Sequence, residues 1–255
     1  MKFNGDFKNN TTKYSKKEII NTLHEKLPSV FDYSKERKII SNKYIDLAIK
    51  HQYKNYRMCT IGDIHSLGLL RSFTDNQKQF FNDNGEFLVI FNEIGGKPIS
   101  IVLRSLKQKQ FIDFSVFYNA YGIDMIDSDF KYGDWLILTE GIYDADSFRI
   151  IYNNVLAMLT SNITLMQTEV LSTLTNKFIL AFDNDAAGIQ GVEIAKKKLN
   201  AIIPGCEIEV LTMYARDKDL GTMEEKINKI EDYNVRKEYY SAIVRFIVDK
   251  EGLTW

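Results

Sequence analysis

The spacing of apolar residues over the first part of the chain is typical of amphipathic helices. Ser15 and Glu18 form a capping-box pattern just before an apolar stripe, and Pro28 closes the segment, so one helix is expected between Ser15 and Pro28. Three further segments show helical spacing, at residues 42–51, 61–70 and 75–81. We therefore expect a first part that is mostly helical.

The pattern changes to strand-like runs after Asn84-Gly85. Two β-rich runs, at residues 86–91 and 99–103, flank a Gly-Gly turn that predicts a hairpin, and a third short strand is expected at 111–116. From Trp135 onwards, strands and helices alternate. The expected strands cover residues 135–138, 155–158, 177–182 and 207–211, and the intervening helices cover 144–152, 168–174 and 186–199.

Short, continuous apolar strands that alternate with helices indicate a buried, mostly parallel sheet flanked by helices. The expected fold class is α/β, or α+β for the chain as a whole, with an N-terminal mixed helical and β lobe and a helical C-terminal tail. We expect three parts: the lobe at residues 1–131, the α/β domain at 132–222 and the helical segment at 223–255.

Composition narrows the class of protein. The chain has 255 residues, of which 45% are hydrophobic and 13% aromatic, so a large core is possible and a disordered chain is excluded. The net charge of -1 argues against nucleic-acid binding by bulk positive charge, although a basic track beside an acidic site would cancel in the sum. Two cysteines cannot build a disulfide framework or a four-cysteine zinc module. Neither a secretion signal nor a membrane-spanning run is found, so we expect a cytoplasmic protein without membrane contact.

Acidic residues follow three of the four strands expected in the second half of the chain. Glu140 follows the first strand, Asp183 and Asp185 follow the third, and Asp217 and Asp219 follow the fourth. Because the carboxyl ends of parallel strands meet at one edge of a sheet, these side chains are expected on the same rim. Their mutual repulsion calls for a cation, and carboxylate oxygens without His or Cys favour Mg²⁺ or Mn²⁺.

The acidic positions also have a simpler interpretation. Asp185 stands just before Ala186-Ala187, where an aspartate commonly caps a helix. Gly141 and Gly188 follow the acidic residues and would let the backbone turn tightly and approach a phosphate closely. The metal site is therefore inferred from the three acidic clusters together, since a single Asp-x-Asp is most often a turn or a cap.

The acidic motifs resemble those of the Toprim domain, which bacterial DnaG-type primases share with topoisomerases and some nucleases. The resemblance rests on Glu140-Gly141 after one strand and on Asp183-x-Asp185-x-x-Gly188 after a later one, and it covers roughly residues 132–223. The longer run Glu140-Gly141-Ile142-Tyr143-Asp144 is similar to the primase version of the first motif, and Asp217-Lys218-Asp219 is similar to the third acidic motif. A Toprim-like fold is therefore expected.

The residues before this region resemble the lobe that precedes the Toprim domain in bacterial primases. In that lobe a strand that ends in an arginine is followed by lysines, as with Arg104, Lys107 and Lys109 here. The resemblance implies that these three residues contact nucleotide phosphates or the template–primer backbone, whereas Lys218 either contacts phosphate or balances charge. Ordinary solvation is the alternative for a surface lysine pair. The segment at residues 117–123 is similar to a short aromatic and glycine segment that follows in primases.

The resemblance implies a primase core that makes short RNA primers on single-stranded DNA from ribonucleoside triphosphates. The ions would be Mg²⁺ or Mn²⁺, two in all, and their expected ligands are Glu140, Asp183, Asp185, Asp217 and Asp219. The expected catalytic residues are Glu140, Asp183 and Asp185. Glu140 would serve either as a metal ligand or as the general base. Gly141, Asp144 and Gly188 are expected to orient the loops.

Departures from the primase pattern define the expected partners and the alternatives. The sequence has no zinc-binding module and no helicase-type Walker A loop, so a replicative helicase or a separate template-selecting protein is the expected partner. Such a reduced core is typical of phages and mobile elements. Two alternatives stay open: a Toprim nuclease, in which water replaces the primer 3′-hydroxyl, and a non-catalytic primase-like binding protein.

Overall fold

A computed structural model describes residues 13–36, 42–115, 120–149 and 152–211. The chain divides into two compact units, each with its own sheet and hydrophobic core. The first unit comprises Met1–Phe91 and Pro98–Val116, and the second comprises Asn92–Lys97 and Phe117–Trp255. The expected division at residues 131 and 222 stays a prediction.

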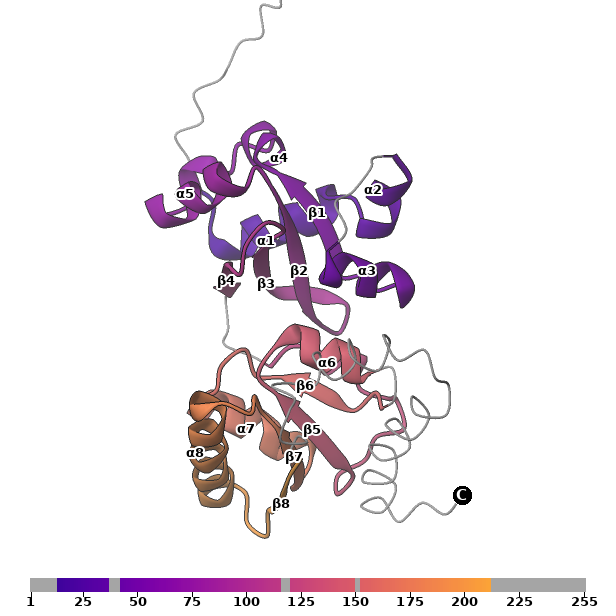
Figure 1. Ribbon diagram of the computed structural model, residues 1–255, viewed down its shortest axis with the longest axis vertical. Helices are drawn as coiled ribbons and strands as arrows, with labels where there is room; N and C mark the ends of the chain where they lie inside the picture. Colours follow the sequence, from indigo (N-terminus) through magenta and orange to yellow (C-terminus); the bar gives the residue numbers. More distant parts are fainter. Residues whose placement is uncertain (1–12, 37–41, 116–119, 150–151, 212–255) are drawn as a thin grey trace, which may run out of the picture. The chain divides into compact units, whose positions relative to one another are not determined.

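The first unit packs helices against a four-stranded sheet (Figure 1). The strand order is β1-β2-β3-β4, where β1 is Tyr56–Thr60, β2 is Glu86–Ile94, β3 is Lys97–Ser105 and β4 is Phe111–Ser115. β1 pairs antiparallel with β2, and β3 pairs antiparallel with β4. The helices are α1 (Lys16–Lys26), α2 (Val30–Glu36), α3 (Lys43–Lys50), α4 (Ile61–Ser66) and α5 (Asp75–Asn84), with a 3-10 turn at Leu70–Ser72.

Sequence patterns located most of these elements. The predicted capping box of Ser15 and Glu18 starts α1, and the predicted Gly-Gly turn joins β2 to β3. Gly95 and Gly96 have φ values of 60° and 69°, the positive values that a two-residue hairpin turn requires. β1 and α2 were not predicted. β1 is an edge strand whose burial does not alternate strictly, and α2 has only 7 residues, so both depend on tertiary packing more than on local pattern.

Aromatic side chains fill the core of the first unit. Phe80 and Phe81 of α5 pack on Phe87 of β2, with ring centroids 5.6 Å and 5.2 Å apart. Leu103 of β3 belongs to the same core. Because successive side chains of a strand alternate between faces, the next residue, Arg104, points to the opposite face of the sheet.

The second unit is built on a four-stranded parallel sheet of order β6-β5-β7-β8. The strands are β5 (Trp135–Thr139), β6 (Val155–Ala157), β7 (Lys177–Ala181) and β8 (Glu207–Val210), and the helices between them are α6 (Ile142–Phe148), α7 (Leu165–Leu174) and α8 (Ala186–Ile202). A 3-10 turn at Ile123–Met125 precedes β5. The predicted parallel sheet flanked by helices is confirmed (Figure 1). Every residue of β5 is buried, which accounts for its continuous apolar pattern.

The bounds of several helices differ from the expected ones. α4 ends at Ser66, four residues before the expected end, because Gly68, with a φ of 69°, leaves the helical conformation. α6 begins at Ile142, two residues before the expected start, because Gly141 takes the N-cap position. α7 begins three residues early, at Leu165, because Thr164 and Gln167 form a capping box. The expected helical tail at 223–250 lies outside the described residues. Among the helices that the structure describes, none has the length and apolar character needed to span a bilayer.

Candidate metal and nucleic-acid sites

Glu140 and Asp183 come from neighbouring strands and lie together at the carboxyl edge of the parallel sheet. β5 and β7 pair with Thr139 opposite Ala181, so the residues that follow both strands leave the sheet at the same level. The Glu140 Oε1 atom accepts a hydrogen bond of 3.2 Å from the backbone N–H of Asp183. The structure therefore brings two of the expected acidic residues into contact.

Asp185 lies two residues further on and caps α8. Its Oδ1 atom accepts hydrogen bonds from the backbone N–H groups of Ala187, at 3.1 Å, and Gly188, at 3.0 Å. The interpretation of this aspartate as a helix N-cap is therefore correct. Both bonds involve Oδ1, one of the two oxygens of the carboxylate.

Gly188 allows the loops that follow β5 and β7 to approach each other closely. A Cβ atom at this position would lie 1.9 Å from the Asp183 backbone oxygen and 2.8 Å from Glu140 Oε1. Any larger residue would push the Asp183 backbone and the Glu140 side chain aside. At Gly141, a Cβ atom would lie 2.6 Å from Asp144 Oδ2, so this glycine makes room for the Asp144 carboxylate in the first turn of α6.

The described part of this rim is not a complete metal cage. No group of three or more His, Cys, Asp and Glu side chains that could hold an ion occurs within the described residues. Glu140, Asp183 and Asp185 nevertheless supply carboxylate oxygens at one sheet edge, a donor set that fits Mg²⁺ or Mn²⁺ better than a soft metal. Outside the described residues lie the other expected members of the rim, Asp217, Lys218 and Asp219.

The expected basic residues belong to the first unit. Arg104 lies near the end of β3, and its guanidinium carbon is 4.9 Å from the centre of the Tyr44 ring. The Arg104 Nε atom is buried and has no hydrogen-bond partner among the described residues. Lys107 and Lys109 are exposed in the turn between β3 and β4. The end of β3 and the turn thus carry three cationic side chains close together in the chain.

Ser105 shapes the turn that carries both lysines. Its buried hydroxyl donates to Asn84 Oδ1 and accepts from the backbone N–H groups of Lys107 and Gln108, each at 3.1 Å. The Ser105 N–H donates to the Gln110 carbonyl at 3.0 Å. These bonds fix the backbone of the turn. The role of this serine was not predicted, although a serine at the start of a polar turn is a known signal for this kind of bonding.

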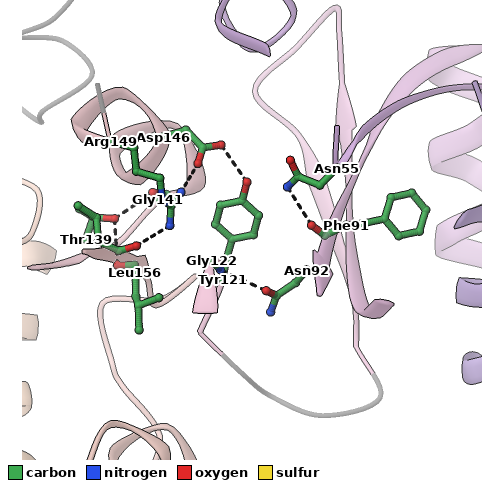
Figure 2. Close-up of polar contacts among 11 residues, drawn as sticks. Asn55, Phe91, Asn92, Tyr121, Gly122, Thr139, Gly141, Asp146, Arg149 and Leu156 are labelled. Carbon is green, nitrogen blue, oxygen red and sulfur yellow. Dashed lines mark hydrogen bonds and ion pairs between the residues drawn. The ribbon is translucent and has the colours of Figure 1, made fainter. Parts of the chain in front are cut away.

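A buried ion pair holds α6 in the second unit (Figure 2). Arg149, which follows the last residue of α6, pairs with Asp146 one turn earlier and also donates to the backbone carbonyl of Val155 in β6. The Tyr121 O–H donates to Asp146 Oδ2 at 2.9 Å, and the guanidinium lies 5.4 Å from the Tyr121 ring centre. The network therefore ties α6 to β6 and to the segment that carries Tyr121.

Gly122 allows the segment that carries Tyr121 to pack closely against Arg149. Its φ of 99° favours glycine, and a Cβ atom there would lie 1.9 Å from Arg149 Nη2. Its N–H donates to Asn92 Oδ1 at 3.2 Å (Figure 2). The roles of Asp146 and Arg149 were not predicted from the sequence. Their signal was a pair of opposite charges three residues apart, the spacing at which two side chains meet on a helix.

Comparison with known proteins relates this geometry to a family. The sequence model of a family described as Toprim-like matches residues 137–223. No curated protein sequence matches the chain. The E. coli primase catalytic core has a TM-score of 0.58 and 16% identity, over 88% of this chain and 80% of that one. A DnaG primase catalytic domain bound to ssDNA has a TM-score of 0.60 and 15% identity, over 91% and 82% of the two chains.

A third solved structure agrees with these two. The Aquifex aeolicus primase, in a structure of its zinc-binding and RNA polymerase domains, has a TM-score of 0.57 and 19% identity, over 95% of this chain and 74% of that one. At such identities the likeness establishes the fold alone. The matched family region contains both loops of the acidic rim, with Glu140 and Asp183. Residues 137–223 therefore form a Toprim domain, within a chain that has the fold of the DnaG primase catalytic core.

Proposed function

We propose that the chain synthesises short RNA primers on single-stranded DNA by nucleotidyl transfer that depends on Mg²⁺ or Mn²⁺. The observation that carries this proposal is the contact between Glu140 and Asp183 at adjoining strand ends of a Toprim domain in a primase-like fold. Asp185 adds a third carboxylate to the rim. A rim of this kind suits phosphoryl chemistry, because the cations it binds also neutralise a triphosphate.

Each residue of the rim has a proposed part in the reaction. The hydrogen bond from the Asp183 N–H orients the Glu140 carboxylate, which would serve as a metal ligand or as the general base. Gly188 permits the close approach of the two loops, and Asp144 would orient the loop at the start of α6. When bound, two divalent ions lower the pKa of the primer 3′-hydroxyl and neutralise the departing pyrophosphate. The proposed ligands are Glu140, Asp183, Asp185 and one or both of Asp217 and Asp219.

The basic residues of the first unit would hold the nucleic acid. We propose phosphate contacts for Arg104, Lys107 and Lys109. Such contacts hold a strand without recognising its base sequence. Lys218 would contact phosphate or balance the charge of its acidic neighbours. The proposed partners are a single-stranded DNA template, ribonucleoside triphosphates, and a replicative helicase or a template-selecting protein. We place this reaction in the cytoplasm of a host cell, with a phage or mobile element as the source.

Two other functions would use the same rim. A Toprim nuclease would hydrolyse phosphodiesters with water in place of the primer 3′-hydroxyl. A non-catalytic primase-like protein would only bind a replication partner. The first unit, which precedes the Toprim domain, favours primer synthesis over a nuclease, since the likeness to primase catalytic cores extends over 88% of the chain. The acidic residues of the rim argue against a pure binding protein, which has no need of their mutual repulsion.

The proposal is tested on single-stranded DNA with labelled ribonucleotides and Mg²⁺ or Mn²⁺. We expect short oligoribonucleotides that a chelator abolishes and that Asp183→Asn abolishes, because the amide keeps the size of the side chain but not its charge. The matched control is Asp129→Asn, at an exposed aspartate of the same unit, which should keep the activity. Cleaved DNA without synthesis would identify the nuclease. Neither product, with helicase added, would identify the binding protein.

A further inference from the structure

An exposed phenylalanine stands beside Arg104 at the edge of the first unit's sheet. Phe111 is the first residue of the edge strand β4, and 57% of it is exposed. It lies directly opposite Arg104 in the β3–β4 pair, and residues opposite each other point to the same face of a sheet. Single exposed aromatic residues are ordinary on protein surfaces. What distinguishes Phe111 is that the residue opposite it is an arginine whose guanidinium packs on a second aromatic ring, that of Tyr44.

Arg104 is held in place by an aromatic ring, and among the described residues it forms no ion pair with an acidic side chain. Its guanidinium packs on the Tyr44 ring, a cation–π contact that fixes its position. Its buried Nε has no hydrogen-bond partner within the part of the chain that the structure describes. A buried donor that stays unpaired is costly, and a guanidinium presents several N–H groups to one anion. Arg104 as a whole is partly exposed, so an anionic ligand from outside the chain can reach its side chain.

The adjoining turn places more positive charge at the same edge. Lys107 and Lys109 are exposed on it. The Leu106 carbonyl of the turn accepts a hydrogen bond of 3.3 Å from Asn42, the N-cap of α3, and Tyr44 stands in the first turn of the same helix. α3, the end of β3 and the turn are therefore connected into one surface, and Phe111 is exposed at its border.

We infer that Phe111 and Arg104 form a stacking platform for a base of single-stranded DNA, while Lys107 and Lys109 meet the flanking phosphates. Proteins bind single strands by combining a cationic track with aromatic rings, because unpaired bases offer their faces for stacking. A duplex hides those faces, so an exposed ring would contribute little to its binding. The inference rests on the proposed nucleic-acid interface and goes beyond it by naming the residue that meets a base.

Phe111→Ala in the full chain tests the platform. Fluorescence anisotropy would measure the binding of a short oligothymidylate and of an abasic strand of equal length over a range of salt concentrations. We expect the variant to bind oligothymidylate about tenfold more weakly, a usual loss for one stacked base. Its affinity for the abasic strand should equal that of the wild type, and Phe111→Trp should restore the affinity for oligothymidylate.

Matched controls separate stacking from charge and from the loss of a surface phenylalanine. Phe31 is 44% exposed on α2 of the same unit, and Lys35 Nζ already lies 4.1 Å from its ring centre, so Phe31→Ala should bind both strands as the wild type does. The Lys107→Gln/Lys109→Gln variant should reduce the slope of log affinity against log salt by about 1.4, since each neutralised phosphate contributes about 0.7 for a single strand. Phe111→Ala should leave this slope unchanged.

Three results would overturn the platform: equal affinities of Phe111→Ala and Phe31→Ala, an equal loss on the abasic strand, or no binding of the single strand by the wild type. These outcomes are distinct from a failure of primer synthesis. A chain that makes primers while Phe111→Ala binds normally would refute the platform alone. A chain that shows base stacking but makes no primers would refute the proposed function alone.

Discussion

The buried pair of Asp146 and Arg149 allows a quantitative test of what holds α6 in place. Asp146 is 0% exposed and Arg149 is 7% exposed, so both charges lose their hydration when the second unit folds. Arg149→Met is the informative perturbation, because methionine fills much of the same space without charge. It would leave the Asp146 carboxylate buried without its cation, and the Val155 carbonyl without the donor that Arg149 supplies.

The expected magnitudes follow from the burial of both partners. Breaking a buried pair from one side costs about 3–5 kcal/mol in free energy of unfolding, because an uncompensated charge is left inside. Replacing the whole polar group by apolar side chains, in Tyr121→Phe/Asp146→Leu/Arg149→Met, should be neutral or stabilising by about 1–4 kcal/mol. A domain has a stability of about 5–15 kcal/mol, so the single change removes a large share of it.

Trp135 supplies the signal for this measurement. It lies in β5 of the second unit and is buried, so its fluorescence reports the unfolding of that unit in urea. A Trp255→Phe background removes the other tryptophan. The matched control is Glu193→Gln, which breaks an exposed pair with Lys196, at 3.1 Å and with the same i, i+3 spacing. We expect this control to change the free energy of unfolding by less than about 0.5 kcal/mol.

Two results would refute the reasoning about the pair. Arg149→Met could lower the free energy of unfolding by less than about 1 kcal/mol, the value of an exposed pair. Alternatively, the triple variant could be as unstable as Arg149→Met. The first result would mean that water reaches the Asp146 carboxylate. The second would mean that the charges contribute net stability, against the expected cost of their desolvation.

Three further predictions, two on substitutions and one on the cysteine thiols, can be measured directly. Gly188→Ala should lower metal-dependent primer synthesis about 100-fold by displacing the Asp183 backbone, and an unchanged rate would show that the loops tolerate the extra methyl group. Ser105→Ala should lower the free energy of unfolding of the first unit by about 1–3 kcal/mol in a denaturant titration, because buried polar groups lose their partner, whereas no change would place water at the turn. Burial raises the pKa of the Cys59 thiol far above its ordinary value and raises the pKa of Cys206 to about 11, so both thiols stay protonated at pH 8. Alkylation at that pH should therefore be slow until urea is added and should speed up at Cys206 as the pH approaches 11, and rapid labelling of the native chain would contradict this.

The parallel sheet could be predicted because each of its strands is a continuous apolar run. All residues of β5 are buried, as are all of β6, so neither strand needs a polar face and the pattern is unambiguous. The rule that parallel strands end at one edge then predicted that Glu140 would lie near Asp183, and the structure has their hydrogen bond. Local pattern and a topological rule were sufficient for this part of the rim.

The stacking surface could not be predicted in the same way. Arg104 was predicted to contact nucleic acid, but its contact with Tyr44 joins positions 60 residues apart in the chain (104 - 44). No local sequence pattern predicts a contact between two elements at that separation. β1, which lies beside β2 in the same sheet, was not predicted. The pairing of Phe111 with Arg104 depends on the register between β3 and β4, which the sequence did not predict. Contacts of this kind depend on tertiary packing.

Asp144 and Asp146 show why motif spacing alone does not assign a role to an acidic residue. The two are neighbours on α6, yet Asp144 is partly exposed near Gly141 while Asp146 is fully buried against Arg149. At 3.6 residues per turn, two residues correspond to a rotation of about 200°, so they point to nearly opposite sides of the helix. Which of the two aspartates points into the core depends on where the helix starts, and the sequence pattern predicted that start two residues too late. Gly141, which takes the N-cap position, sets the phase of α6 and thereby decides which aspartate is buried and which stays partly exposed.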